Sequence, residues 1–221
     1  MISFTFDDFP RSALHVGGQI LEEHGLSATY YAALGLINTE APVGRIFSEE
    51  DLNEVQLRGH ELGCHTFDHC HGWHTPSNAF EASVLRNREA LNRLLPDASF
   101  QTHAYPYGLA RPETKRRISE YFLCCRGGPQ RCNFGRTDLN YLNAFFLEQV
   151  RGDLTAVTAV VDQNCRSGGW LIFGTHEVAE NPSRLGCSPE FFRDVVRYAA
   201  ASGATILPVA AALKSIIRPE V

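Results

Sequence analysis

The 221-residue chain lacks any long apolar run and any dense cluster of positive charge. No window approaches the roughly 18 apolar residues needed to cross a bilayer, so a membrane-spanning protein is not expected. The 20 Lys and Arg residues against 25 Asp and Glu residues give a net charge of −5, and the sequence pI is about 6.0. This balance argues against a nucleic-acid-binding protein, because such proteins carry basic surfaces.

The sequence also lacks a secretory signal, since no basic start leads into an apolar stretch and a small-residue cleavage site. Its seven cysteines are odd in number, scattered, and form no C-x-x-C pair. We therefore expect free thiols in a cytoplasmic protein rather than a disulfide framework. Cysteine-based hydrolysis or redox chemistry has little support, because no cysteine falls at a helix start beside an activating base.

No G-x-G-x-x-G follows the first apolar run, which removes the main support for dinucleotide binding. What the chain has is an alternation of strand-like runs with helical stretches, typical of parallel β-α units. The strand-like runs are ISFTF, SATYYAAL, ELGCH, SFQTHAYPY, YFLCC, NAFFL, WLIFGT and ATILPV. The helical stretches lie at 13–24, 48–58, 76–95, 111–119, 154–166, 189–201 and 209–217. With no repeat or linker, residues 1–221 are predicted to form a single-domain (β/α) barrel.

Ionisable or turn-forming residues stand at the C-terminal ends of four of these runs, where barrel active sites gather. They are Asp7 and Asp8, His65 with His69 four residues on, Tyr107 and Gly108, and His176. One carboxylate and two imidazoles form a site for a divalent metal that leaves positions open for water and substrate. Such a metal activates water, while a second carboxylate accepts a proton and a further histidine protonates a leaving group. One of the adjacent aspartates would then bind metal and the other would act as base.

Each of these signals also has an ordinary structural explanation. Paired aspartates after a strand are often a helix cap and a solvated turn. The segment HTFDHCHGWH holds four histidines, and we assign His71 and His74 to surface or packing roles. The coincidence of all the pieces at four strand ends favours the catalytic interpretation.

Taken in order, the motifs resemble those of the polysaccharide deacetylases, carbohydrate esterase family 4, with its NodB-type homology domain. The matching segments are TFDD at 5–8, HTFDH at 65–69, YPYG at 105–108 and LIFGTH at 171–176. The resemblance implies a distorted, incomplete barrel of about seven to eight parallel strands. It also implies a divalent metal cofactor, most often zinc and sometimes cobalt or another divalent ion.

The resemblance implies a role for each matching position. Asp7 would be the general base, and Asp8, His65 and His69 would be the metal ligands. His176 would be the general acid that protonates the departing amine. The backbone N–H of Tyr107, the second tyrosine of YPYG, would bind the oxyanion opposite the metal.

Two positions depart from the family pattern. The arginine that opens the third motif in many members is replaced here by Ala104. We predict that Arg126, at the end of the run YFLCC, supplies that cation beside the catalytic base. The aspartate–tryptophan motif that tunes the catalytic histidine is not recognisable, and we predict that Asp138 or Asp153 orients this histidine instead.

The predicted reaction is removal of an N-acyl group, above all N-acetyl, from an aminosugar or a short oligosaccharide. Tyr105 and Trp73 are predicted to contact the sugar, and Tyr107 to contribute its backbone N–H. One alternative keeps the metal but changes the C–N bond, as in deformylation or hydrolysis of a cyclic ureide. Another is a catalytically inactive barrel that binds a glycan or a partner. The oligomeric state is left open by the sequence.

Overall fold

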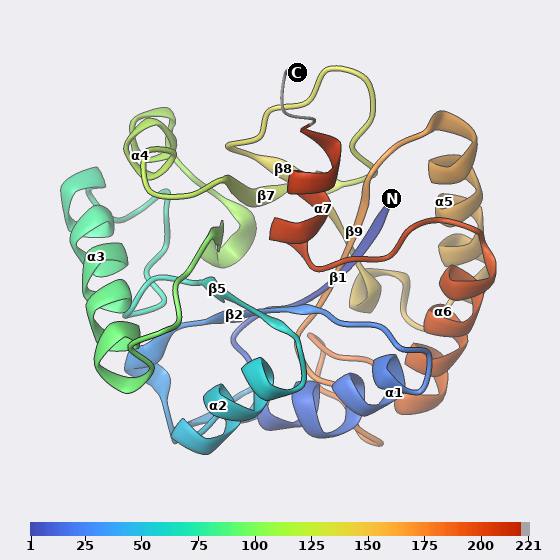
Figure 1. Ribbon diagram of the computed structural model, residues 1–221, viewed down its shortest axis with the longest axis horizontal. Coiled ribbons are helices and arrows are strands. Elements are labelled where there is room, and N and C mark those ends of the chain that lie inside the picture. The colour runs from blue at the N-terminus through green and yellow to red at the C-terminus, as the bar shows by residue number, and fades with distance from the viewer. Residues whose placement is uncertain (218–221) are drawn as a thin grey trace.

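Seven parallel strands close into a barrel in the computed structural model, which describes residues 1–217 (Figure 1). In sheet order they are β1 (Ile2–Phe6), β2 (Thr29–Ala32), β5 (Glu61–Cys64), β6 (Thr102–Ala104), β7 (Cys124–Gln130), β8 (Leu142–Phe146) and β9 (Leu171–Thr175). The pairing of β9 with β1, from Ile2↔Leu171 to Phe6↔Thr175, closes the circle. The predicted (β/α) barrel of parallel strands is confirmed.

Helices cover the outside of this barrel. They are α1 (Gln19–Glu22), preceded by a π-helical segment (Ala13–Gly18), α2 (Glu49–Leu57), α3 (Ser77–Leu94), α4 (Pro112–Ile118), α5 (Leu154–Ser167), α6 (Pro189–Ala201) and α7 (Val209–Ile216). In Figure 1, α3 and α4 lie on one side of the barrel and α5 and α6 on the opposite side. Short 3₁₀ turns occupy Leu34–Leu36, Pro106–Gly108 and Leu147–Val150. A small hairpin of β3 (Glu40–Ala41) and β4 (Gly44–Arg45) was not predicted.

Local sequence signals explain where several helices begin and end. Ser48 and Asp51 form a reciprocal capping box at the start of α2. Ser188 caps α6 by accepting from the Phe191 N–H, and Pro189 occupies the first helical position. Gly168 ends α5 in the left-handed conformation, with a φ of 60°, which glycine adopts without steric cost.

The alternation of side chains along β1 separates the outer core from the barrel interior. Phe4 and Phe6 pack outward against Phe192 of α6, with ring centroids 5.9 and 5.7 Å apart. Residues of the opposite parity, beginning with Ser3, face the barrel interior, and this row ends at Asp7. The strand therefore delivers a carboxylate to the inside of one barrel mouth.

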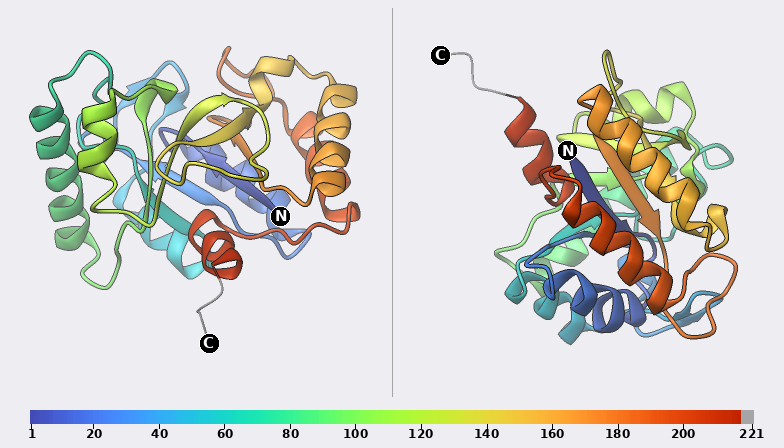
Figure 2. Two further views of the ribbon diagram at one scale, coloured as in Figure 1. Left: turned by 90° about the horizontal axis from the view of Figure 1, so that it is seen from above. Right: turned by 90° about the vertical axis from the view of Figure 1, so that its right-hand side faces the viewer.

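Helix α7 closes the other mouth, where the strands begin (Figure 2). The Val209 N–H donates to Thr29 Oγ1 over 2.9 Å, and the Ala210 N–H donates to Glu61 Oε2 over 2.8 Å. The segment ATILPV, expected as a strand, makes only the isolated bridge Ile2↔Ile206 on its way into α7. A closed barrel has no free edge left for an eighth strand.

Two further expectations concern the whole chain. All seven cysteines are free thiols, as the sequence predicted. Among residues 1–217, no helix combines the length and the apolar character that crossing a membrane requires.

Candidate active site

The ends of the strands surround a cavity of about 840 Å³ at the mouth opposite α7. Residues from distant parts of the chain line it, including Asp7, Asp8, His65, His69, Tyr107, Glu148 and His176. The structure thus brings together the predicted metal ligands, the predicted base and the predicted acid. Arg126 lies beside the cavity, bonded to one of its lining residues.

A sharp turn lets both neighbouring aspartates reach the cavity. Asp8 and Phe9 adopt left-handed backbone conformations, with φ values of 60° and 52°. The Phe9 ring leaves the site and stacks on Phe47, with centroids 4.8 Å apart. Non-glycine residues in this region of φ carry a steric cost and cluster at functional sites. Because of this turn, the two adjacent aspartates at the end of β1 both line the same cavity.

Asp8, His65 and His69 form a compact triad. Asp8 Oδ1 lies 2.9 Å from His69 Nε2 and 3.4 Å from His65 Nε2. The three ligating atoms all lie within 4.8 Å of one another. This convergence places a carboxylate oxygen and two ring nitrogens around one point, as the sequence predicted.

The hydrogen bond made by His65 Nδ1 orients the ring in a way that suits a cation at this triad. Its Nδ1 lies 2.8 Å from the Ala104 carbonyl oxygen, an acceptor only, so Nδ1 carries the proton and donates it. In the neutral ring, Nε2 then carries a lone pair that faces the Asp8 carboxylate. The lone pair of His65 Nε2 and the negative charge of the Asp8 oxygen repel one another unless a cation lies between them. Nitrogen and carboxylate ligands in this number suit zinc and other divalent transition metals.

Arg126 forms a buried ion pair with Asp7. The guanidinium is 1% exposed and lies between the rings of Tyr31 and Phe146, 4.9 and 5.2 Å from their centroids. Burial alone would raise the pKa of Asp7, but the charge and hydrogen bond of Arg126, together with the nearby His65 and His176, outweigh it and lower that pKa. Arg126 pairs in register with Ala104 on the adjacent strand, so the cation stands one strand away from the position that the family pattern gives it.

His176 contacts two acceptors through Nδ1, the Leu185 carbonyl oxygen at 3.1 Å and Glu148 Oε1 at 3.4 Å. Burial lowers the pKa of His176, but the hydrogen bond with Glu148 and the charges of Asp7, Asp8 and Glu148 together raise it to about 9. The ring is therefore held as a proton donor at neutral pH.

The prediction that Asp138 or Asp153 orients the catalytic histidine is wrong. Asp138 pairs with Lys115, and Asp153 caps α5 by accepting from the Thr155 N–H over 2.9 Å. Glu148, in the turn that follows β8, takes the expected place. The signal for it was present, because this carboxylate follows the run NAFFL just as the other site residues follow their strands.

Tyr107 reaches the site through its backbone as well as its ring. It lines the cavity with a left-handed backbone, φ 61° and ψ 9°, and its N–H donates no hydrogen bond to any residue in 1–217. The ring packs on His69 and stacks on His71, with centroids 4.9 and 4.8 Å away. A backbone donor and a part-exposed ring are therefore both available to a ligand.

The two predicted sugar-contacting aromatics lie elsewhere. Tyr105 is 1% exposed and packs edge-on against His103 in the core, so the predicted contact with substrate is corrected. Its side chain does not line the cavity. Trp73 is 49% exposed but lies outside the cavity lining, and its contact with a sugar stays a prediction.

A family model described as polysaccharide deacetylase matches residues 1–122, more than half of the chain. The chain belongs to the polysaccharide deacetylase family. The matched part of the chain contains Asp7, Asp8, His65, His69 and Tyr107, whereas Arg126, Glu148 and His176 lie beyond it. No curated protein matches the sequence.

Solved structures share the fold along nearly the whole chain. A deacetylase solved with substrate is 18% identical, with a TM-score of 0.65, covering 98% of this chain and 92% of its own. A family 4 acetyl xylan esterase from Clostridium thermocellum, solved with a cobalt ion, is 15% identical with a TM-score of 0.65, covering 97% and 90%. A carbohydrate esterase family 4 pseudoenzyme from Bacillus anthracis is 12% identical with a TM-score of 0.66, covering 96% and 65%. At these identities the likeness concerns the fold.

Proposed function

We propose that this member of the polysaccharide deacetylase family is a metal-dependent hydrolase that removes an N-acyl group, above all N-acetyl, from an aminosugar or short oligosaccharide. One observation carries the proposal. A single cavity holds a triad suited to a divalent cation, a carboxylate kept ionised by Arg126, and an imidazole kept protonated by Glu148. Metal-assisted hydrolysis of an amide uses these three functions: a Lewis acid, a base for the water and an acid for the leaving amine.

The residues on the water side prepare the attack. A divalent ion held by Asp8, His65 and His69, zinc or cobalt above all, would polarise the scissile carbonyl and make water more acidic. Asp7 accepts the proton that the attacking water loses. Arg126 keeps Asp7 ionised and fixes its orientation, because the buried ion pair leaves the carboxylate little freedom. Asp7 is thus ready to act without first losing a proton.

The residues on the opposite side serve the carbonyl oxygen and the leaving group. The Tyr107 N–H is free to donate to the oxygen as negative charge develops on it. His176 gives its proton to the departing amine nitrogen, which is a poor leaving group without one. Glu148 and the Leu185 carbonyl hold the His176 ring by Nδ1, so that Nε2 is the atom that can donate.

A substrate panel with amine detection tests this proposal. The protein, loaded with zinc or cobalt, is assayed on N-acetylated, N-formylated and cyclic ureide compounds, with and without a chelator. We expect chelator-sensitive release of amine from N-acetyl aminosugars. Turnover confined to formyl or ureide compounds would favour the alternative activity, deformylation or hydrolysis of a cyclic ureide. Metal content without turnover on any of them would point to a catalytically inactive binding protein.

A further inference from the structure

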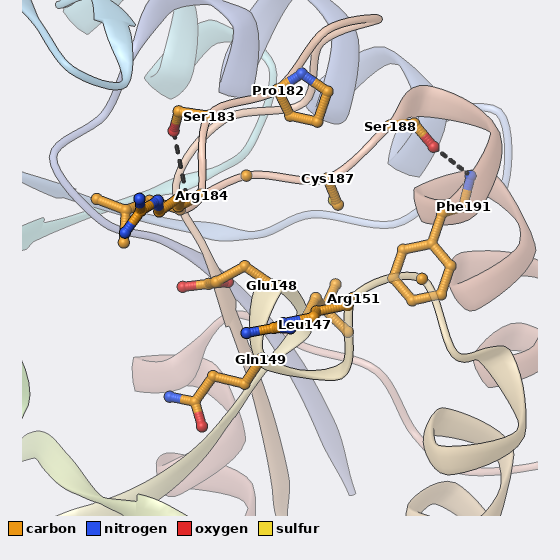
Figure 3. A pocket seen from close by; sticks show the side chains of 13 residues that line it. Leu147, Glu148, Gln149, Arg151, Pro182, Ser183, Arg184, Cys187, Ser188 and Phe191 are labelled. Carbon is orange, nitrogen blue, oxygen red and sulfur yellow. Dashed lines mark hydrogen bonds between the residues drawn. The ribbon is translucent and has the colours of Figure 1, made fainter.

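A second cavity, of about 960 Å³, adjoins the candidate active site (Figure 3). It lies between the turn that contains Glu148 and the loop 182–188, beside the start of α6. Glu148, Gln149 and Leu185 line both cavities, so the two are separated only by residues that belong to each. A ligand larger than one sugar unit in the active site would extend into this second space.

The charge of the second cavity differs from that of the first. Its cationic lining residues are Arg151 and Arg184, both exposed, and within residues 1–217 neither lies within 4.0 Å of a carboxylate. Its acidic lining residue is Glu148, whose Oε1 is paired with His176. Two arginines without anionic partners beside one neutralised carboxylate leave the cavity positive.

The loop that carries Arg184 is held firmly against the site. Glu177 Oε1 accepts from the Ser183 N–H over 2.5 Å, and the Glu177 carbonyl accepts from the Cys187 N–H over 3.0 Å. A Cβ on Gly186 would lie 2.1 Å from Glu177 Cγ, so the backbone approaches this side chain more closely than any other residue type permits. The loop thus presents Arg184 to the cavity from a fixed backbone.

The start of α6 adds to the same field. Ser188 and Phe191, the cap and the first turn of this helix, both line the second cavity. The N-terminus of a helix carries a partial positive charge, which favours anions nearby. Two arginines and a helix start therefore converge on one space, while the active-site cavity supplies the ionised Asp7 and Asp8.

We propose that this second cavity binds an anionic group of the substrate, phosphoryl or carboxylate, while the N-acyl group occupies the active-site cavity. The proposal rests on the proposed function and narrows its substrate class. Guanidinium groups bind planar or tetrahedral oxyanions through paired hydrogen bonds, and free arginines offer all of theirs. The preferred substrate is then a charged aminosugar, such as a sugar phosphate, a nucleotide sugar or an N-acylated sugar acid, rather than a neutral oligosaccharide.

A selectivity measurement tests this inference. The kcat/KM values of the metal-loaded protein are compared for N-acetylglucosamine 1-phosphate, UDP-N-acetylglucosamine, N-acetylmuramic acid and neutral di-N-acetylchitobiose. We expect the ratio of anionic to neutral substrate to fall about tenfold or more in Arg151→Gln/Arg184→Gln, mainly through KM. Arg93→Gln/Arg136→Gln removes the same charge from two other exposed arginines and should leave the ratio near that of the parent protein. An equal ratio in the two double variants would overturn the inference.

A binding measurement separates this inference from the proposed function. Calorimetry on the Asp7→Asn variant follows binding of the same compounds, and of inorganic phosphate and lactate alone, without turnover. We expect the phosphorylated and carboxylated sugars to bind more tightly than chitobiose, and the difference to vanish in Asp7→Asn/Arg151→Gln/Arg184→Gln. The phosphate and lactate arms tell the two anion types apart. Charge-dependent binding without turnover in the parent protein would refute the hydrolase but keep the anion site, whereas turnover with no preference for charge would do the reverse.

Discussion

Each mouth of the barrel holds a carboxylate, Glu61 at the closed mouth and Asp8 at the open mouth, and the two have different kinds of neighbours. At the closed mouth, Glu61 accepts from Thr29 Oγ1 at 2.9 Å, Thr102 Oγ1 at 2.6 Å and the Ala210 N–H at 2.8 Å. At the open mouth, Asp8 faces the Nε2 atoms of two histidines. Neutral donors satisfy the Glu61 carboxylate within the protein, whereas Asp8 Oδ1 has no hydrogen-bond donor among residues 1–217, which suits the cation proposed here.

The backbone conformation also differs between the two mouths: residues with positive φ concentrate at the open mouth. Of the seven non-glycine residues with positive φ among residues 1–217, five lie in the turns around the Asp8–His65–His69 triad and the Tyr107 N–H: Asp8, Phe9, Thr66, His69 and Tyr107. At the closed mouth, by contrast, α7 docks with regular helical geometry. Strain gathers where side chains must converge, and regular packing supports it from the far end.

The largest effect is expected when the carboxylate at the open mouth, Asp8, is removed. Asp8→Ala leaves two imidazoles and should lose the metal, with activity falling by about 10³-fold or more, because a bound cation supplies several kcal/mol to such reactions. Metal content by mass spectrometry and amine release measure the two effects together. Stoichiometric metal in Asp8→Ala would contradict the assigned ligand set.

The second prediction separates metal binding from proton transfer. Asp7→Asn keeps the shape of the side chain but removes the base, so turnover should fall by about 10²- to 10⁴-fold while metal content stays unchanged. The same two assays apply. Retention of most of the activity would show that another group accepts the proton.

The third prediction concerns pH at the open mouth. His176 donates only while protonated, so activity should decline as pH rises through its pKa of about 9. Glu148→Gln removes the charge that raises this pKa, and the alkaline limb of the kcat/KM profile should move about one unit lower. Metal content serves as the control. An unmoved limb with a lower plateau would mean that Glu148 acts only by packing.

The smallest effect is expected from the matched change at the closed mouth. Burial raises the pKa of Glu61 in the folded protein, although its three hydrogen bonds partly lower it. Stability from this group is therefore fully present below the unfolded pKa and is lost as pH rises through the folded value. Glu61→Gln carries no charge, so its advantage in the free energy of unfolding should grow with pH, to about 1 kcal/mol.

Urea unfolding between pH 4 and 8 measures this difference, and amine release supplies the control. Activity of Glu61→Gln should match that of the parent protein, because the residue lies at the opposite end of the barrel. A pH-independent difference in unfolding free energy would show that Glu61 has the same pKa in the folded and the unfolded protein, and would contradict the raised pKa. Together with Asp8→Ala, the variant asks whether the two mouths can be altered independently.

Much of the site was predictable because it depends on local pattern. The rule that barrel chemistry gathers at strand C-termini selected Asp7, His65 and His176 from single runs of sequence. The same rule would have found Glu148 after NAFFL. It failed for Tyr105, because the sequence does not show at which residue of YPYG the chain turns out of the core.

Other features depend on which strands are neighbours. Ala104 and Arg126 are separated by 21 intervening residues, yet they are register partners on β6 and β7, so an arginine lost from one strand is supplied by the next. The preference for Asp138 or Asp153 failed for the same reason. Sequence separation does not reveal which acid borders His176, since Asp138 and Asp153 are used by Lys115 and by α5.

By itself, the amino-acid sequence determined that strands and helices alternate, and that carboxylates and imidazoles stand at the strand ends. Those are properties of side-chain periodicity and of short motifs, which neighbouring residues decide. Only the tertiary structure decided that the barrel closes through β9 and β1, that Arg126 reaches Asp7, and that Arg151 and Arg184 share a cavity beside Glu148. Such contacts follow from the register of paired strands and the paths of loops. Both are set by the packing of many residues that lie far apart in the sequence.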